Sequence, residues 1–269
     1  MIYAHAVITG ASSGFGAAFA RYLAGCCGHL VLVARRVEAL EALAGELRAA
    51  HPALQVTVRP CDLAEETARR ALGAQLAALP TGSLLLVNNA GLGDYGAFDS
   101  SRPERNRELL QVNICAPVEL TRALLPRLAE QGGAVVNIAS LAADLFIPDF
   151  ALYAASKAYV ASWSEALRLE LRETGVRVLT VCPGPVHTGF GEVARRSGTR
   201  GGDYPLKEWF YTPIETVVAG SLAALERGCP RFYPARRVRA VAWLLRNLPL
   251  GLLRAVMGRR PRRNREEGA

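Results

Sequence analysis

Features that define several common protein classes are missing from this sequence of 269 residues. Its six cysteines contain no Cys-x-x-Cys pair, and they form no metal-ligand spacing with the four histidines. We therefore expect no metal site. Because several of the cysteines lie inside apolar runs, we interpret them as buried, reduced thiols of a cytoplasmic protein.

Targeting and membrane-spanning patterns are missing as well. Residues 1–5 lead directly into an expected strand, without the basic segment that begins a signal peptide. No apolar run reaches about 18 uncharged residues, the length that predicts a transmembrane helix. The sequence contains no internal repeat. These absences favour a cytoplasmic protein without repeat architecture.

Acidic residues are lacking between positions 231 and 265, although this segment contains 11 arginines. The net charge of +8 is therefore unevenly distributed, because residues 1–230 carry 21 Lys and Arg against 22 Asp and Glu. Hydrophobic residues make up 51% of the chain, which predicts a folded protein with a substantial core. We expect a nearly neutral body followed by a strongly basic C-terminal segment.

Apolar, strand-like segments alternate with segments of helical periodicity along most of the chain. This alternation predicts a parallel sheet covered by helices on both faces. The expected strands are residues 4–9, 29–34, 55–60, 84–88, 134–138, 177–182 and, as a short last strand, 231–233. The expected helices are residues 15–26, 37–49, 64–79, 102–130, 151–173 and 216–227, with a Gly- and Pro-rich loop at 184–213.

A glycine-rich turn, Thr-Gly-Ala-Ser-Ser-Gly-Phe-Gly, lies at residues 9–16 between the first expected strand and the first helix. Glycines permit a tight turn and a close approach of the backbone to a ligand. The N-terminus of the following helix offers free N–H groups to a pyrophosphate. A plain packing role for the glycines is the alternative. The position between strand and helix favours a dinucleotide site.

A second candidate site surrounds the segment Tyr-Ala-Ala-Ser-Lys at residues 153–157. On a helix, Tyr153 and Lys157 share one face, one turn apart. A cation near a phenol favours the phenolate and lowers its pKa, which suits general acid–base chemistry. Ser140 follows the expected strand 134–138, so its hydroxyl can face the cleft at the strand ends. Taken alone, Tyr-x-x-x-Lys is better explained by an ordinary amphipathic helix.

Several motifs in register resemble the classical short-chain dehydrogenase/reductases. They are the TGxxxGxG turn, Asn88-Asn89-Ala90-Gly91, Asn113, Ser140, Tyr153-x-x-x-Lys157 and Pro183-Gly184. The local sequences around these motifs are similar to those of the bacterial subgroup typified by DltE-like reductases. The resemblance covers residues 1–233. It implies an α/β, Rossmann-type doubly wound parallel sheet in a single domain, with residues 234–269 as a basic, apolar, helical C-terminal tail.

The resemblance implies an oxidoreductase that moves hydride between a nicotinamide and a carbonyl or alcohol carbon. Tyr153 would be the general acid or base, and Lys157 would lower its pKa and bind ribose hydroxyls. Ser140 would hold the substrate oxygen, and Asn113 would hold a water in a proton relay to Lys157. A nucleotide-sensing regulator that has lost the chemistry is an alternative, although the intact set of four residues argues against it.

The resemblance also implies a set of cofactor-binding residues. Asp62 would hold the adenine, with an N-cap of the next helix as a further interpretation. Thr188 would contact the carboxamide or the pyrophosphate. The full set is Gly10, Ser12, Ser13, Gly14, Phe15 and Gly16 at the turn, Arg35, Arg36, Asp62 and Leu63, Asn89 and Gly91, Tyr153 and Lys157, and Pro183, Gly184, Val186 and Thr188.

The preferred cofactor follows from the charge after the second expected strand. NAD-dependent proteins place an acid there for the ribose 2′-hydroxyl. This chain has Arg35 and Arg36 instead, with no acid before Glu38. Because guanidinium groups pair well with phosphate, we predict NADP(H). The alternative is that the two arginines are solvated residues at the start of a helix.

Apolar residues near Tyr153 and in the long loop suggest a lipophilic small-molecule substrate. An equally weighted alternative is that some of them only anchor the loop to the core. The predicted substrate pocket contains Leu145, Phe150, Phe190, Trp209 and Phe210.

The C-terminal segment combines apolar runs with arginines, and Pro249 and Gly251 should divide it into two short helices. Trp243 and the flanking arginines suit an anionic membrane surface, which would place the protein at the inner face of the membrane. An oligomer contact and a flap over the substrate mouth are alternatives. Nucleic acid is not expected, because no recognised binding motif accompanies the arginines. We expect a homodimer or homotetramer.

Overall fold

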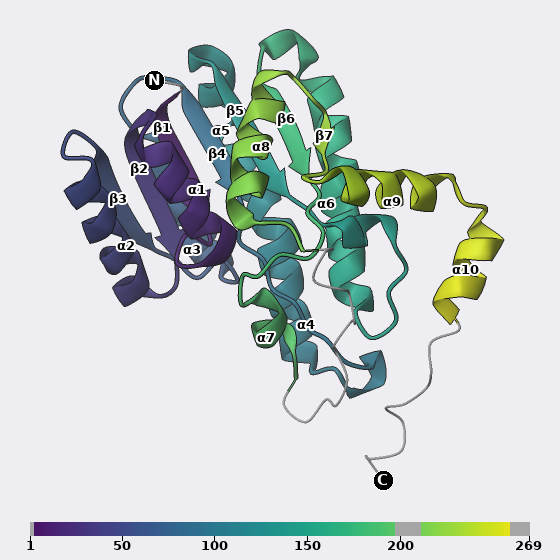
Figure 1. Cartoon of the computed structure of the whole chain (residues 1–269). Helices are drawn as coiled ribbons and strands as arrows, with labels where there is room; N and C mark the ends of the chain where they lie inside the picture. Colours follow the sequence, from purple (N-terminus) through teal and green to yellow (C-terminus); the bar gives the residue numbers. More distant parts are fainter. Residues whose placement is uncertain (1–2, 197–210, 259–269) are drawn as a thin grey trace.

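A seven-stranded, fully parallel sheet forms the centre of the protein. The computed structural model describes residues 3–196 and 211–258. The strand order is β3-β2-β1-β4-β5-β6-β7. The strands are β1 (Tyr3–Thr9), β2 (Cys27–Ala34), β3 (Gln55–Pro60), β4 (Leu84–Asn88), β5 (Gly133–Ile138), β6 (Arg177–Val181) and β7 (Arg231–Phe232). The predicted Rossmann-type doubly wound sheet is thus confirmed (Figure 1).

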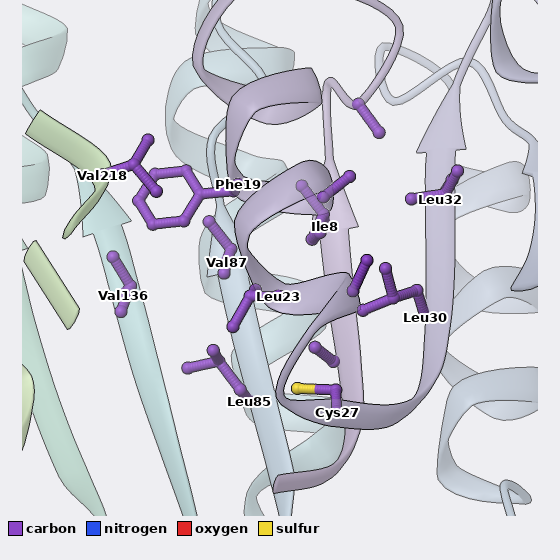
Figure 2. Packing of buried hydrophobic residues seen from close by; sticks show 14 of the residues in the cluster. Ile8, Phe19, Leu23, Cys27, Leu30, Leu32, Leu85, Val87, Val136 and Val218 are labelled. Carbon is purple, nitrogen blue, oxygen red and sulfur yellow. The ribbon is translucent and has the colours of Figure 1, made fainter. Parts of the chain in front are cut away.

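Helices cover both faces of this sheet. The α-helices among the described residues are α1 (Gly14–Ala24), α2 (Val37–Ala50), α3 (Glu66–Ala77), α4 (Pro103–Leu110), α5 (Ala116–Gln131), α6 (Ala151–Glu170), α7 (Phe190–Ala194), α8 (Ile214–Glu226), α9 (Arg236–Asn247) and α10 (Leu250–Gly258). Helices α1, α2 and α8 pack on one face and α3, α5 and α6 on the other. Figure 2 shows part of the first layer, where Phe19 of α1 and Val218 of α8 face the sheet.

Strand β4 illustrates why the sheet forms. All five of its residues are buried, and they alternate between the two layers: Leu85 and Val87 pack with α1 and α8, whereas Leu84 and Leu86 pack with α3 and α5. A strand buried on both faces reads as a continuous apolar run. Strand order reverses between β1 and β4, and ligands of such sheets bind in the crevice beyond the carboxyl ends at that point.

The helix predicted over residues 102–130 is interrupted. Helix α4 ends at Leu110, a π-turn occupies Gln111–Cys115, and α5 follows. The amide of Ala116 bonds to the carbonyl of Gln111, five residues earlier. Pro117 has no N–H and cannot donate the bond that an α-helix would direct at the carbonyl of Asn113. The interruption therefore falls on Asn113, and π-turns of this kind often mark functional positions.

The C-terminal segment forms two helices separated at Pro249, as predicted, but Gly251 lies inside α10 and takes no part in the division. Val238 and Ala242 of α9 are buried in a small cluster with Leu141. A Cβ added to Gly184 would lie 3.0 Å from Cγ2 of Val238. Helix α9 therefore packs against the segments that follow Ser140 and β6, across the proposed boundary at residue 233. Within the described residues, no helix has the length and apolar character needed to cross a bilayer.

Candidate active site

The glycine turn after β1 is too tightly packed for side chains. Gly10 has a φ of +66°, and a Cβ on it would lie 2.9 Å from the Cα of Ala90. A Cβ on Gly16 would overlap the carbonyl oxygen of Gly10. Ser13 is the N-cap residue of α1, but its side chain makes no capping hydrogen bond. The amide groups at the start of α1 thus keep their capacity for an anionic ligand, which fits the phosphates of a dinucleotide.

A groove of about 660 Å³ adjoins this turn. Its lining includes Ser12, Ser13 and Gly14 from the turn and His187 and Thr188 from the segment after β6. Cβ of Thr188 would lie 3.3 Å from a Cβ on Gly14, so the two segments are in contact. The segment is fixed at its start by a hydrogen bond from the amide of Leu141 to the carbonyl of Pro183, at 2.9 Å.

The two adjacent arginines after β2 have different partners. Arg36 reaches across the glycine turn: its Nη2 donates to Oγ of Ser12 at 3.0 Å and to Oγ of Ser13 at 2.9 Å. Arg35 instead donates from Nη1 to Glu108 at 2.8 Å. Arg36 therefore lies at the glycine turn itself, whereas Arg35 is held by a carboxylate of α4.

Asp62 follows β3, as expected, and its Oδ1 accepts a hydrogen bond from the amide of Ala64 at 3.0 Å. The N-cap residue of α3 is Glu65, so the interpretation of Asp62 as the cap of that helix is wrong. Asp62 stabilises the turn that precedes the helix, because a short carboxylate readily accepts from an amide two residues later. Leu63 is buried beside it.

Asn89 holds the ends of β1 and β4 together. Its Nδ2 donates to the carbonyl oxygens of Thr9 at 2.9 Å and Gly10 at 3.2 Å. Two residues further on, a Cβ on Gly91 would lie 3.3 Å from Nζ of Lys157 and 3.6 Å from Oδ1 of Asn113. The absence of a side chain at Gly91 thus lets the loop after β4 approach both residues.

Tyr153, Lys157 and Ser140 converge beyond the carboxyl end of β5. Nζ of Lys157 lies 5.8 Å from the centroid of the Tyr153 ring and donates to the carbonyl oxygen of Ile138 at 2.8 Å. Burial raises the pKa of Tyr153 to about 12, and the hydrogen-bonding Ser140 side chain opposes this rise. Burial also lowers the pKa of Lys157 to about 8. Desolvation is thus the largest effect on the pKa of Tyr153 in this structure, and the lowering of that pKa by Lys157 stays a prediction.

Asn113 is buried and connects three segments. Its Oδ1 accepts from the amide of Leu92 at 2.8 Å, and its Nδ2 donates to the carbonyl of Leu92 at 2.9 Å and to Oγ of Ser156 at 3.0 Å. Ser156 in turn donates to the carbonyl oxygen of Tyr153 at 2.7 Å. The sequence analysis did not select Ser156. Its only signal was its position inside the Tyr-x-x-x-Lys segment.

Aromatic side chains surround the Tyr153 ring. Phe150 stacks on it with 4.2 Å between centroids, and the Phe190 ring lies at 5.4 Å. Leu145 ends the short turn after Ser140 and is not a member of the cluster around Tyr153. That cluster does include Ile147, and also Leu92 and Leu109, which were not predicted from the sequence. Trp209 and Phe210 lie outside the described residues.

Comparison with known proteins identifies the family of this chain. Residues 4–197 match the family model described as short chain dehydrogenase. The chain is 32% identical over 268 residues to dehydrogenase/reductase SDR family member 7B from Bos taurus, covering 97% of this chain and 82% of that protein. The chain therefore belongs to the short-chain dehydrogenase family and is an oxidoreductase.

Solved structures show the same fold with nicotinamide cofactors. A short-chain dehydrogenase from Sphingobium yanoikuyae in complex with NADPH is similar with a TM-score of 0.79 and 30% identity, covering 96% of each chain. A short-chain dehydrogenase/reductase from Burkholderia phymatum in complex with NAD is similar with a TM-score of 0.77 and 27% identity, covering 89% of this chain and 92% of that one. This family membership makes the protein a hydride-transferring enzyme that uses a nicotinamide cofactor.

Proposed function

We propose that the protein is an NADP-dependent reductase or dehydrogenase that interconverts a lipophilic carbonyl compound and its alcohol. The observation that carries the proposal is the convergence of Ser140, Tyr153 and Lys157 beyond the carboxyl end of β5, where the Lys157 ammonium donates a hydrogen bond to Ile138. Bound NADPH would supply hydride to the carbonyl carbon.

The proton steps belong to the side chains. With a pKa of about 12, the Tyr153 phenol is neutral at pH 7 and can donate its proton to the carbonyl oxygen of the substrate. Ser140 would donate a hydrogen bond to the same oxygen and stabilise its developing negative charge. Lys157, with a pKa of about 8, remains mostly protonated at pH 7 and adds a positive charge next to the phenol. Asn113 would support the proton relay toward Lys157.

Arg36 supports the preference for NADPH. Its guanidinium lies against the hydroxyls of Ser12 and Ser13, where it can also meet a phosphate on the adenosine ribose. The short-chain dehydrogenases that this chain resembles include proteins in complex with either NADPH or NAD, so the choice depends on this chain's own residues.

The side chains around Tyr153 support the proposal that the substrate is apolar. Phe150 and Phe190 contact the Tyr153 ring from two directions, and Ile147 and Leu109 pack in the same cluster. A substrate that reaches the phenol would exchange water for these apolar surfaces, which favours lipophilic molecules.

The C-terminal helices support a second proposal, that the enzyme contacts an anionic membrane surface. Trp243 of α9 is 67% exposed, and Leu250 and Leu252 of α10 are about half exposed. Arg239 and Arg246 are exposed next to Trp243 on α9. Arginines with an exposed Trp are typical of interfacial helices. The expected homodimer or homotetramer also remains a proposal, supported by Leu169 of α6, which is 66% exposed.

The direct test is a screen of ketones, aldehydes and alcohols with purified protein, following the absorbance of NADPH. We expect faster turnover of apolar aryl or alkyl ketones than of charged ones, and a lower KM for NADPH than for NADH. Tight binding of NADPH without turnover of any carbonyl would instead support a nucleotide-sensing regulator.

A further inference from the structure

Two segments about a hundred residues apart in the sequence contact each other next to Tyr153. One is the loop after β4, from Gly91 to Ser100, and the other is α7 with Arg195 and Arg196. The guanidinium of Arg196 forms a bidentate ion pair with Asp94: Nε donates to Oδ1 at 2.8 Å and Nη2 donates to Oδ2 at 2.6 Å. Its Nη1 donates to the carbonyl of Ala97 at 2.8 Å and to Oγ of Ser100 at 3.0 Å.

This ion pair differs from the surface pairs of the molecule. The Asp94 side chain is 7% exposed and that of Arg196 is 19% exposed, whereas those of the equally bidentate pair Arg21–Glu46 are 53% and 51% exposed. A Cβ on Gly96 would lie 2.9 Å from Nη1 of Arg196, so the glycine makes room for the guanidinium. A bidentate pair shielded from water is stronger and more directional than an exposed one.

Backbone contacts extend the junction beyond the ion pair. The amide of Tyr95 donates to the carbonyl of Ala194 at 2.7 Å, and Tyr95 and Arg195 form a parallel bridge. A Cβ on Gly93 would lie 2.6 Å from Cβ of Ala194 and 2.9 Å from Cζ of Phe190. Helix α7 therefore packs directly against this loop, and its Phe190 ring lies near the Tyr153 ring.

We propose that Asp94 and Arg196 are positioning residues whose ion pair holds α7 against the loop after β4. In this position Phe190 covers Tyr153 and limits the size of the carbonyl substrate. This inference rests on the proposed function. The ion pair acts through α7 and does not touch the reacting atoms. Loss of the pair would release α7, which would weaken the binding of small substrates and admit larger ones.

The test uses the full-length enzyme with saturating NADPH and three ketones of increasing size: acetone, acetophenone and benzophenone. Asp94→Asn removes the charge with little change of shape, and Arg196→Lys keeps the charge but loses the two-pronged geometry. We expect KM for the smaller ketones to rise roughly tenfold in both variants, the loss expected for a charged hydrogen bond, with kcat changed less. The ratio of kcat/KM for benzophenone to that for acetone should rise.

Glu46→Gln is the matched control, because it breaks the same bidentate geometry at the exposed pair between α1 and α2. It should leave KM and size preference unchanged. The charge-swapped double variant, Asp94→Arg with Arg196→Asp, should recover part of the loss. If both single variants keep the KM values and size preference of the control, the proposal is overturned. Arg196→Lys tests it even where Asp94→Asn fails to fold.

A second measurement separates this proposal from the proposed function. Hydrogen–deuterium exchange of the NADPH complex reports the amide of Tyr95, which donates to Ala194, without requiring turnover. We expect this amide to exchange roughly tenfold faster in Asp94→Asn than in the wild type or in Glu46→Gln. Unchanged exchange overturns the positioning role. Faster exchange in a protein that reduces no carbonyl supports the ion pair and refutes the proposed activity.

Discussion

The ammonium nitrogen of Lys157 donates a hydrogen bond to the carbonyl oxygen of Ile138 at 2.8 Å. Ile138 is the last residue of β5 and stands two positions before Ser140. One hydrogen bond therefore joins helix α6, which carries Tyr153, to the strand end that carries Ser140. The lysine is 4% exposed, and burial lowers its pKa to about 8. Lys157 is thus fixed in a place where burial of its charge is unfavourable for folding.

Replacing Tyr153 by Phe should remove the proton donor and preserve the apolar packing with Phe150. We expect kcat/KM for carbonyl reduction to fall at least ~10²- to 10⁴-fold, the range for general acid–base groups. The affinity for NADPH should change little. Tyr159→Phe is the matched control, because Tyr159 lies on the same helix and is 44% exposed. Near-normal reduction by Tyr153→Phe would exclude the phenol as the proton donor.

The two arginines after β2 should differ in their effect on the cofactor. Arg36→Ala should weaken NADPH roughly 10- to 100-fold, because a charged hydrogen bond to the 2′-phosphate is lost, and should affect NADH much less. Arg35→Ala should have the smaller effect, since Arg35 is paired with Glu108. Dissociation constants from NAD(P)H fluorescence measure both. An equal loss for NADPH and NADH in Arg36→Ala would mean that the residue only stabilises the glycine turn.

The lowered pKa of Lys157 predicts a pH dependence of stability. Because its pKa is about 8 in the folded state and ~10.4 in an unfolded chain, the unfolded state binds more protons between these values. The contribution of Lys157 to the free energy of unfolding should therefore rise as the pH rises from 8 toward 10. At pH 7 the buried charge should cost roughly 3 kcal/mol.

Lys157→Met tests this prediction. The variant should lose activity, should be at least as stable as the wild type at pH 7, and should lack the part of the rise above pH 8 that Lys157 contributes. Urea denaturation at pH 7, 8 and 9 measures the difference between the two proteins. The chain has only two lysines, Lys157 and Lys207, so the variant also assigns the Lys157 signal for an NMR titration. A Lys157 pKa near 10 in the free enzyme would contradict the proposed origin of the effect.

Two truncations distinguish the roles of the C-terminal helices. Removing residues 249–269 keeps α9 and should preserve turnover of a small ketone. Removing residues 238–269 deletes Val238 and Ala242, which pack with Leu141 next to Ser140, and should lower both stability and turnover. Stability is measured by thermal unfolding and turnover by NADPH oxidation. Full activity after the longer deletion would show that α9 is a detachable tail.

The shorter truncation also tests the membrane proposal. It removes the exposed Leu250 and Leu252 and also the last arginines. Each arginine contributes about 1 kcal/mol of binding free energy near an anionic surface. Sedimentation with vesicles of phosphatidylglycerol should fall relative to the full chain, and the full chain should bind less at high salt. Trp243→Ala, with all arginines kept, is the matched variant for the apolar part. Equal sedimentation of the truncated and full chains would refute the membrane contact.

The predictable parts of this protein are those that depend on neighbouring residues. The alternation of apolar strands and amphipathic helices predicted the parallel sheet, because burial on both faces requires that pattern. The glycine turn could be predicted because Gly adopts the φ of +66° at Gly10 without strain, and because a side chain at Gly16 would overlap the carbonyl oxygen of Gly10. Even the split at Asn113 had a local signal in Pro117, although the helical periodicity on either side concealed it.

Other properties were decided only by the tertiary structure. The pKa of Tyr153 depends on burial by distant segments, which is the largest effect on it. An amphipathic pattern does not state what covers its apolar face, and α9 uses Val238 and Ala242 against its own domain. The Asp94–Arg196 pair joins residues 102 positions apart and has no local signature. The sequence by itself determined the sheet, the turns and the residue types of the site. Only the packed chain decided which charges are desolvated and which faces meet, because both depend on contacts between distant segments.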